Sequence, residues 1–282
     1  GVAIDNNLNG VITKITNSVF KNNRVYRTGE ETTTGNYHAS AGAIDNYNYI
    51  GEISNTTFEG NVAESVASSA GSGAIMNVYW ADDTSIGRID SITNVTFKDN
   101  HVYSQNDVAY GGAISSDTSV EGKQAYIGSI SGSFTGNYAQ SDSSSAYGGA
   151  IDNSGTIGTI TADFKDNYAE GNRDDSSKIG AMGGAIYNYG ADAKITKIVG
   201  DFTTNHAENK TGASHAMGGA IFNRGGAEIT NGIEGNFTGN WAKSDLSYAA
   251  GGAIYNIGTI GTITATFKDN YAESNYDVSA NI

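Results

Sequence analysis

The stretch Gly149–Ala169 reads GAIDNSGTIGTITADFKDNYA, and Gly252–Ala272 reads GAIYNIGTIGTITATFKDNYA, with only three differences in 21 positions. Both begin with Gly-Ala-Ile and contain Phe-x-x-Asn near their end, and this pair of motifs occurs eight times along the chain. A unit repeated every 31 to 40 residues indicates a solenoid, in which each repeat buries its apolar face only against its neighbours. The first motif has its alanine at Ala3, Ala43, Ala74, Ala113, Ala150, Ala185, Ala220 and Ala253.

The pattern within the last repeat predicts short strands joined by corners. The segment Gly252–Asn256 places alternate side chains on opposite faces, as a strand does. The segment Ile263–Phe267 alternates apolar residues with threonine, which is typical of a half-buried strand. Three-residue steps in the alternation, at Gly261 and at Lys268–Asp269, predict corners. Three short strands and three bends then make one coil of a parallel β-helix.

We therefore predict an all-β fold, a parallel β-helix (β-solenoid) of about eight coils that forms one elongated domain over residues 1–282. The absence of proline fits this fold, because a proline in a central strand would remove a ladder hydrogen bond. The spacing from the last isoleucine of a coil to its phenylalanine is four or five residues, and a β-bulge absorbs one extra residue. Two buried columns are expected, Ile4, Ile44, Ile75, Ile114, Ile151, Ile186, Ile221 and Ile254, and Phe20, Phe58, Phe97, Phe134, Phe164, Phe202, Phe237 and Phe267.

Asparagine recurs at two fixed places in the repeat. Stacked at the inter-strand spacing of about 4.8 Å, side-chain amides can donate and accept along a column. Asparagine also tolerates the left-handed backbone of a corner. We therefore assign both sets to the fold and not to a ligand. The first set is Asn6, Asn46, Asn77, Asn153, Asn188, Asn223 and Asn256, with Ser116 as the exception, and the second is Asn23, Asn61, Asn100, Asn137, Asn167, Asn205, Asn240 and Asn270.

The charge and composition disfavour several classes of partner. The formal net charge is −14, and an acidic surface repels nucleic-acid phosphates and anionic membrane surfaces. No apolar run approaches the roughly 18 residues of a membrane helix, so direct membrane insertion is not expected. The chain has no cysteine, which excludes disulfides and thiolate metal sites. Because it starts inside one repeat and stops just after another, we expect it to be a segment of a longer chain.

The alternating GGAI and FxxN motifs resemble the repeats of bacterial autotransporter passenger regions, including the chlamydial polymorphic outer-membrane proteins. The resemblance covers all eight repeats, although the first three copies depart from GGAI and read GVAI, AGAI and SGAI. It implies a right-handed parallel β-helix at the bacterial cell surface or outside the cell, where such passengers mostly serve in adhesion. Passengers share the coil and differ in their loops, so the resemblance does not identify a ligand.

Two enlarged corners are the first candidate binding site, because function on a fixed scaffold usually lies in variable loops. The insertions Val78–Ser85 and Ser115–Ala125 follow the same asparagine column in adjacent coils, so they should touch. An equally plain interpretation is that both are tolerated insertions without a role. The candidate binding residues are Tyr79, Trp80, Asp82, Asp83, Asp117, Glu121 and Lys123.

Two aromatic rows and one acidic pair are further candidates. Exposed aromatic rows can stack on sugar rings, but more often they stabilise a sheet as cross-strand pairs, and we favour the structural role. Asp5 and Asp45 should lie on adjacent coils, where calcium can relieve their repulsion, but so can a shift of the side chains into water; no cofactor is predicted. The rows are Tyr138, Tyr168, His206, Trp241 and Tyr271, and Tyr187, Phe222 and Tyr255.

The sequence does not predict an enzyme. β-Helix lyases and glycosidases need carboxylates and basic residues clustered on adjacent coils, whereas the recurring Asp99, Asp166 and Asp269 belong to coils that are not neighbours. The leading hypothesis is a non-enzymatic surface stalk or adhesin whose partner is a glycan or protein on a host or bacterial surface. The alternative is a fibre-forming structural protein that associates end to end through exposed coil edges.

Overall fold

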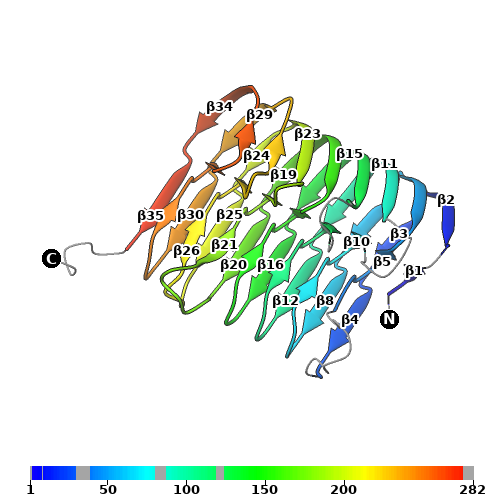
Figure 1. Ribbon diagram of the computed structural model, residues 1–282, viewed down its shortest axis with the longest axis horizontal. Coiled ribbons are helices and arrows are strands. Elements are labelled where there is room, and N and C mark those ends of the chain that lie inside the picture. Colours follow the sequence, from blue (N-terminus) through cyan, green and yellow to red (C-terminus); the bar gives the residue numbers. More distant parts are fainter. Residues whose placement is uncertain (1, 8, 30–38, 80–86, 119–123, 276–282) are drawn as a thin grey trace.

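The computed structural model describes residues 2–7, 9–29, 39–79, 87–118 and 124–275. All regular structure in these ranges is β-strand, and every pairing between strands is parallel. Equivalent strands of successive repeats lie side by side, so the molecule is a stack of coils that extends along one long axis (Figure 1). The strand β1 lies near one end of the stack and β35 at the other (Figure 1). The predicted β-solenoid is therefore confirmed.

The strands form four sheets, here called A to D in the order in which each coil visits them. Sheet A has eight strands, β1 (Ile4–Asn6), β5 (Ile44–Asn46), β10 (Ile75–Tyr79), β14 (Ile114–Thr118), β18 (Ile151–Asn153), β22 (Ile186–Tyr189), β27 (Ile221–Arg224) and β32 (Ile254–Asn256). Sheet C also has eight, β4 (Arg24–Arg27), β8 (Val62–Ser65), β12 (His101–Ser104), β16 (Tyr138–Ser141), β20 (Tyr168–Gly171), β25 (His206–Asn209), β30 (Trp241–Ser244) and β35 (Tyr271–Ser274).

Sheets B and D complete the coil. Sheet B has 13 strands, because some coils cross it in two pieces: β2 (Val11–Thr16), β3 (Val19–Lys21), β6 (Tyr49–Ser54), β7 (Thr57–Glu59), β11 (Arg88–Lys98), β15 (Tyr126–Thr135), β19 (Thr156–Lys165), β23 (Lys194–Val199), β24 (Phe202–Thr203), β28 (Glu228–Ile229), β29 (Ile233–Thr238), β33 (Thr259–Ile260) and β34 (Ile263–Lys268). Sheet D has six, β9 (Ala70–Gly71), β13 (Ala109–Tyr110), β17 (Ala146–Tyr147), β21 (Ile179–Met182), β26 (His215–Met217) and β31 (Ala249–Ala250).

The coil differs from the prediction in two respects. Each full turn visits four sheets and not three strands, because the short strands of sheet D precede the GGAI motif. Within the described ranges, six turns contribute to all four sheets, and the first and the last contribute strands to A, B and C alone. The eight repeats therefore correspond to six complete turns flanked by two partial ones.

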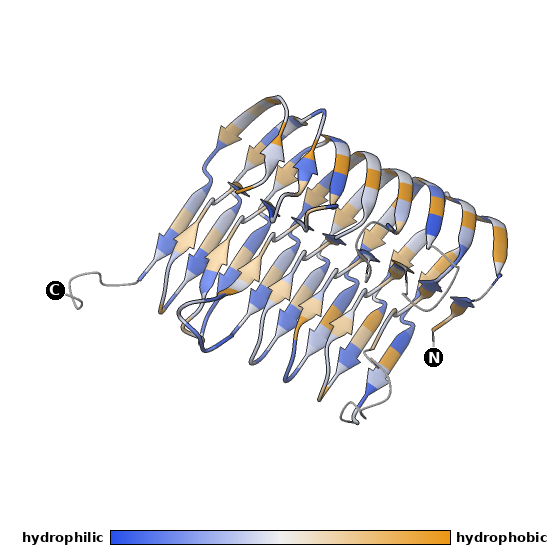
Figure 2. Ribbon diagram, viewed as in Figure 1, coloured by the Kyte–Doolittle hydropathy of each residue, from blue (hydrophilic) through white to orange (hydrophobic). Residues whose placement is uncertain are grey.

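The core is built of columns of identical side chains. The GGAI isoleucines pair in register from Ile4 to Ile254, and those of the six interior coils are fully buried. The phenylalanines stack face to face with ring centroids 4.7 to 5.1 Å apart. Hydrophobic residues recur at the same place in successive strands (Figure 2). The stacking of both predicted columns is confirmed. Their burial is complete only in the interior coils, because Ile4, Phe20 and Ile254 at the ends are partly buried and Phe267 is 49% exposed. Sheets C and D meet instead through alanines such as Ala63 and Ala70.

The residues with left-handed backbone at the corners are not the asparagines of the two columns, so that part of the prediction was wrong. In every coil the residue directly before the second-column asparagine has φ between 53° and 65°, as Asp166 (55°) and Thr204 (54°) illustrate. The predicted bulge is confirmed between Ile92 and Val95, where the register of β11 against β15 shifts. Coils with the longer spacing place a left-handed asparagine there, and Asn94 has φ 53°.

The second asparagine column is an unbroken ladder from Asn23 to Asn270. Each Nδ2 donates to Oδ1 of the next asparagine at 2.7 to 3.0 Å. The same oxygen accepts the preceding asparagine's backbone N–H, as Asn167 N shows with Asn205 Oδ1 at 3.1 Å. From Asn61 onward, Nδ2 also donates to the carbonyl of a phenylalanine one coil back. These asparagines hold the corner by hydrogen bonds, as predicted.

The first asparagine column is interrupted at Ser116. Its other steps are short, for example Asn46 Nδ2 to Asn77 Oδ1 at 2.8 Å and Asn153 Nδ2 to Asn188 Oδ1 at 2.7 Å. Ser116 pairs in register with Asn77 on one side and Asn153 on the other. Its hydroxyl is too short to continue the ladder, and both Ser116 Oγ and Asn153 Oδ1 are buried without a hydrogen-bond partner in the described residues.

Candidate functional site

The corner between sheets D and A is concave on its outer side. Side chains that point outward from sheet D meet those that point outward from sheet A, and they form a second apolar cluster outside the coil. Met182, Tyr187, Met217 and Phe222 are buried in this cluster. The outward position of sheet A directly follows the GGAI isoleucine, and Ser115, Asp152 and Tyr187 occupy it in successive coils.

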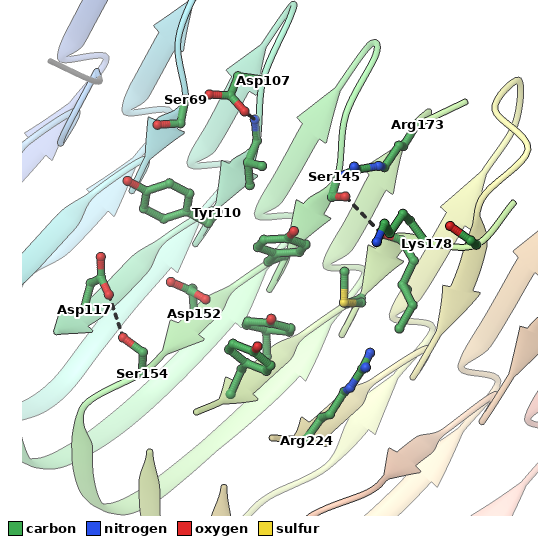
Figure 3. A pocket seen from close by; sticks show the side chains of 17 residues that line it. Ser69, Asp107, Tyr110, Asp117, Ser145, Asp152, Ser154, Arg173, Lys178 and Arg224 are labelled. Carbon is green, nitrogen blue, oxygen red and sulfur yellow. Dashed lines mark hydrogen bonds between the residues drawn. The ribbon is translucent and has the colours of Figure 1, made fainter. Parts of the chain in front are cut away.

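A groove of about 640 Å³ opens along this corner where the outward position of sheet A carries Ser115 and Asp152 in place of a large apolar side chain. Residues from the corner strands and from the loop 172–178 line it. Figure 3 shows these side chains converging from several coils. The lining residues are Ser69, Asp107, Val108, Tyr110, Asp117, Ser145, Tyr147, Asp152, Ser154, Arg173, Ser177, Lys178, Ile179, Met182, Tyr187, Tyr189 and Arg224.

Two carboxyl groups, Asp117 and Asp152, lie on one side of the groove (Figure 3). Asp117 Oδ1 accepts hydrogen bonds from Ser154 Oγ at 2.6 Å and from the Thr118 amide at 2.7 Å. Asp152 is 7% exposed, and its Oδ2 accepts from Ser115 Oγ at 3.0 Å. Burial, and secondly the charge of Asp117, raises the pKa of Asp152 well above its ordinary value. This side of the groove can donate and accept hydrogen bonds.

Tyrosine rings form the apolar wall of the groove. Tyr147 stacks on Tyr187 with centroids 4.8 Å apart, and Tyr187 stacks on Tyr189 at 5.6 Å. Burial raises the pKa of Tyr147 and Tyr187, so both hydroxyls stay protonated and can donate. Tyr189 is 45% exposed. A Cβ atom on residue 225, which is glycine, would lie only 2.9 Å from the Tyr189 ring. Gly225, with φ 77°, therefore leaves room for this exposed ring.

Three basic side chains lie across the groove from the carboxyl groups (Figure 3). Arg173 and Lys178 come from the loop 172–178. The backbone N–H of Asn172, at the start of this loop, donates to the carbonyl oxygen of Ser141 at 3.1 Å. Arg224 ends β27 and pairs in register with Tyr189. None of the three forms an ion pair within the described ranges.

The predicted loop site is covered only in part by the structure. The strands that lead into the two insertions are neighbours, since Val78 pairs with Asp117 and Tyr79 with Thr118. Asp117 lines the groove, whereas only the backbone of Tyr79 is described. Trp80, Asp82, Asp83, Glu121 and Lys123 lie outside the described residues. The contribution of these residues to binding stays a prediction.

The structure also places the other candidates. Asp5 and Asp45 pair in register, and Asp45 Oδ2 accepts from Ser40 Oγ at 2.6 Å. Within the described ranges, no group of three or more His, Asp or Glu side chains is arranged to hold a metal ion. The outward row on sheet C is a continuous stack, with centroid distances from 4.1 Å for His206 and Trp241 to 6.1 Å for Trp241 and Tyr271. Its predicted cross-strand stacking is confirmed.

The sequence interpretation missed the groove. Asp107, Tyr110, Tyr147, Asp152 and Tyr189 were not singled out for binding, although they converge in space. A signal did exist, because the residue after the GGAI isoleucine changes from aspartate, methionine or serine in the first five coils to tyrosine or phenylalanine in the last three. From Tyr187 onward, large aromatic side chains therefore fill the corner between sheets D and A.

The comparisons with known proteins identify no relative: the chain matches no protein-family model, no curated protein and no solved structure. In the described part of the chain, no helix has the length and apolar character needed to cross a membrane.

Proposed function

We propose that this chain is a non-enzymatic bacterial β-solenoid, exposed at the cell surface or outside the cell, that acts as a stalk and binds a glycan in the groove between sheets D and A. The observation that carries the proposal is the composition of the groove. Its tyrosines offer flat apolar faces beside hydrogen-bonding carboxyl, hydroxyl and basic groups in one concavity of about 640 Å³. A few polar groups placed around an apolar pocket are typical of small-ligand sites. The surface location rests on the repeat motifs' resemblance to autotransporter passengers.

A glycan suits these groups better than a flat aromatic or purely apolar ligand does. A pyranose ring has apolar C–H faces that can pack on Tyr189, which is 45% exposed. Its hydroxyls can donate to Asp117 and Asp152 and accept from Tyr147. The net charge of −14 disfavours nucleic acid as an alternative polyhydroxylated ligand.

The test is binding of the labelled chain to a glycan array, followed by titration of the best ligand. Tyr189→Ala should weaken binding about tenfold, which corresponds to about 1.4 kcal/mol. The matched control is Tyr248→Ala, because Tyr248 is also exposed (52%) but does not line the groove. Equal losses in the two variants, or no loss in either, would contradict the proposed site.

The same experiment tests the non-enzymatic assignment. The bound glycan should be recovered intact after prolonged incubation with the protein. Release of new reducing ends that stops in Asp152→Asn would instead make Asp152 a general acid, with its raised pKa suited to that role. The alternative of an end-to-end fibre stays a prediction, and sedimentation velocity over a range of concentrations tests it.

A further inference from the structure

The groove carries opposite charges at its two ends. Asp117 and Asp152 come from the coils nearer the N-terminus, and Lys178 and Arg224 come from coils further along the stack (Figure 3). The parallel register explains this separation, because each step along sheet A moves the position by one coil. A ligand that lies along the groove therefore meets carboxyl groups at one end and cations at the other.

The cations of the groove differ from many of the lysines on the outer faces of the sheets. Several of those lysines pair with a carboxylate of the neighbouring coil, as Lys14 does with Glu52 at 3.0 Å and Lys197 with Glu234 at 2.7 Å, although Lys165 forms no ion pair with a described residue either. Arg173, Lys178 and Arg224 form no such pair in the described residues.

The loop that carries Arg173 and Lys178 also carries two carboxylates, Asp174 and Asp175, and neither forms an ion pair with these cations in the described residues. Asp175 Oδ1 accepts hydrogen bonds from the Ser177 hydroxyl at 2.7 Å and from the Ser177 amide at 2.9 Å. The guanidinium groups of Arg173 and Arg224 keep their donors for another acceptor. A guanidinium matches the two oxygens of a carboxylate through paired N–H donors.

The opposite end of the groove suits neutral hydroxyls and repels anions. Asp117 retains acceptor capacity on Oδ2 after Ser154 and Thr118 have bonded to Oδ1. Two adjacent carboxyl groups offer acceptors to sugar hydroxyls but disfavour a second negative charge nearby. A singly acidic ligand is therefore oriented in one direction along the groove.

We propose that the groove selects glycans that carry a sugar carboxylate, such as a uronic or sialic acid, with the carboxylate held by Arg173, Lys178 and Arg224 and neutral hydroxyls at Asp117 and Asp152. This inference rests on the proposed function, since it names the class of glycan that the same groove takes. The tyrosine wall between the two charged ends supports the sugar ring.

The experiment uses the chain with matched pairs of glycans, each pair consisting of an acidic sugar and its methyl ester. The ester keeps the shape of the sugar and removes only its charge. Titration calorimetry should show at least tenfold tighter binding of the acid, and raising the salt from about 0.05 to 0.5 M should shrink the difference several-fold, because salt screens charge.

Two variants assign the effect to the groove. Lys178→Gln, and independently Arg224→Gln, should weaken binding of the acid several-fold more than binding of the ester, and so reduce the preference for acid over ester. Lys165→Gln makes the same charge change at an exposed lysine of sheet B outside the groove, and it should leave the preference intact. Equal affinity for acid and ester overturns this inference but leaves the proposed function standing. Binding of neither member of any pair overturns both, and an equal effect of Lys165→Gln overturns the assignment to the groove.

Discussion

Replacing Ser116 with asparagine should stabilise the solenoid. Ser116 lies in register between Asn77 and Asn153, and intact steps of the column are 2.7 to 2.8 Å long. An asparagine there can accept from Asn77 Nδ2 and donate to Asn153 Oδ1, which now has no partner in the described residues. The seven other members of the column show that the coil accommodates the amide at this position.

The expected gain follows from the two buried atoms that lack partners. Leaving a buried polar atom unpaired costs about 1–3 kcal/mol, and a hydrogen bond formed in its place contributes about 1 kcal/mol net. Allowing for the rotamer entropy of the added amide, we expect Ser116→Asn to raise the free energy of unfolding by about 2 kcal/mol. For a chain of 282 residues that corresponds to a rise of about 3–4 °C in Tm.

Urea unfolding followed by far-UV circular dichroism measures the change, provided that the slope m is the same for variant and parent. The control is the reverse substitution, Asn188→Ser, which creates the same interruption in an intact part of the column. It should lower the free energy of unfolding by a similar amount. If Ser116→Asn is neutral or destabilising while Asn188→Ser destabilises, the argument that an interrupted ladder is the weak point of the first column is wrong.

Three further predictions test other features. Thr204→Asn should raise the free energy of unfolding by about 1 kcal/mol, because Thr204 holds φ 54° at a corner where the other coils use Gly, Asn or Asp. Thermal denaturation measures this change, and no gain would mean that the backbone strain at Thr204 is absent. Phe164→Ala should cost about 3–5 kcal/mol by leaving a cavity in the stacked column, and Tyr168→Ala on the outer face should cost about 1 kcal/mol, so equal losses in urea titrations would contradict the inside and outside assignment. Burial, and to a smaller extent the Asp5 carboxylate, raises the pKa of Asp45 from 3.8 to about 6, so the folded chain keeps a proton that the unfolded chain loses. This stabilising contribution is present below pH ~4 and disappears as the pH rises to ~6, so the free energy of unfolding should fall by about 2–3 kcal/mol across that range, and Asp45→Asn should abolish the fall.

The repeated columns were predictable because each depends on one rule applied eight times. Identical side chains at identical offsets must stack once the coils are parallel, so Phe164 above Phe134 follows from the spacing alone. The amide ladder follows in the same way, since Asn167 finds Asn137 and Asn205 at the strand spacing. The corner conformation was assigned to the wrong residue because Asp, Gly, Asn and Thr share the preceding position, and their common property is the backbone angle and not the side chain.

Sheet D and the groove were not predictable from the same rule. A two-residue strand such as Ala146–Tyr147 is too short to show alternation. The groove depends on how far the corner closes, which is set by side chains that are far apart in sequence, such as Tyr110, Asp152 and Arg224. The loop 172–178 has no counterpart of the same length in most coils, so its position over the groove could not be inferred from the repeat.

The amide ladders have a consequence for symmetry. In every amide-to-amide step the donor lies on the earlier coil, so the column has a direction: Asn23 presents a carbonyl oxygen on its outer side, and Asn270 presents N–H groups on its own. A twofold axis at either end would bring two acceptors or two donors face to face. Head-to-head and tail-to-tail stacking are therefore both disfavoured. Any coil that continues the column, from this chain or from another copy, must be added by translation along the axis with the same polarity.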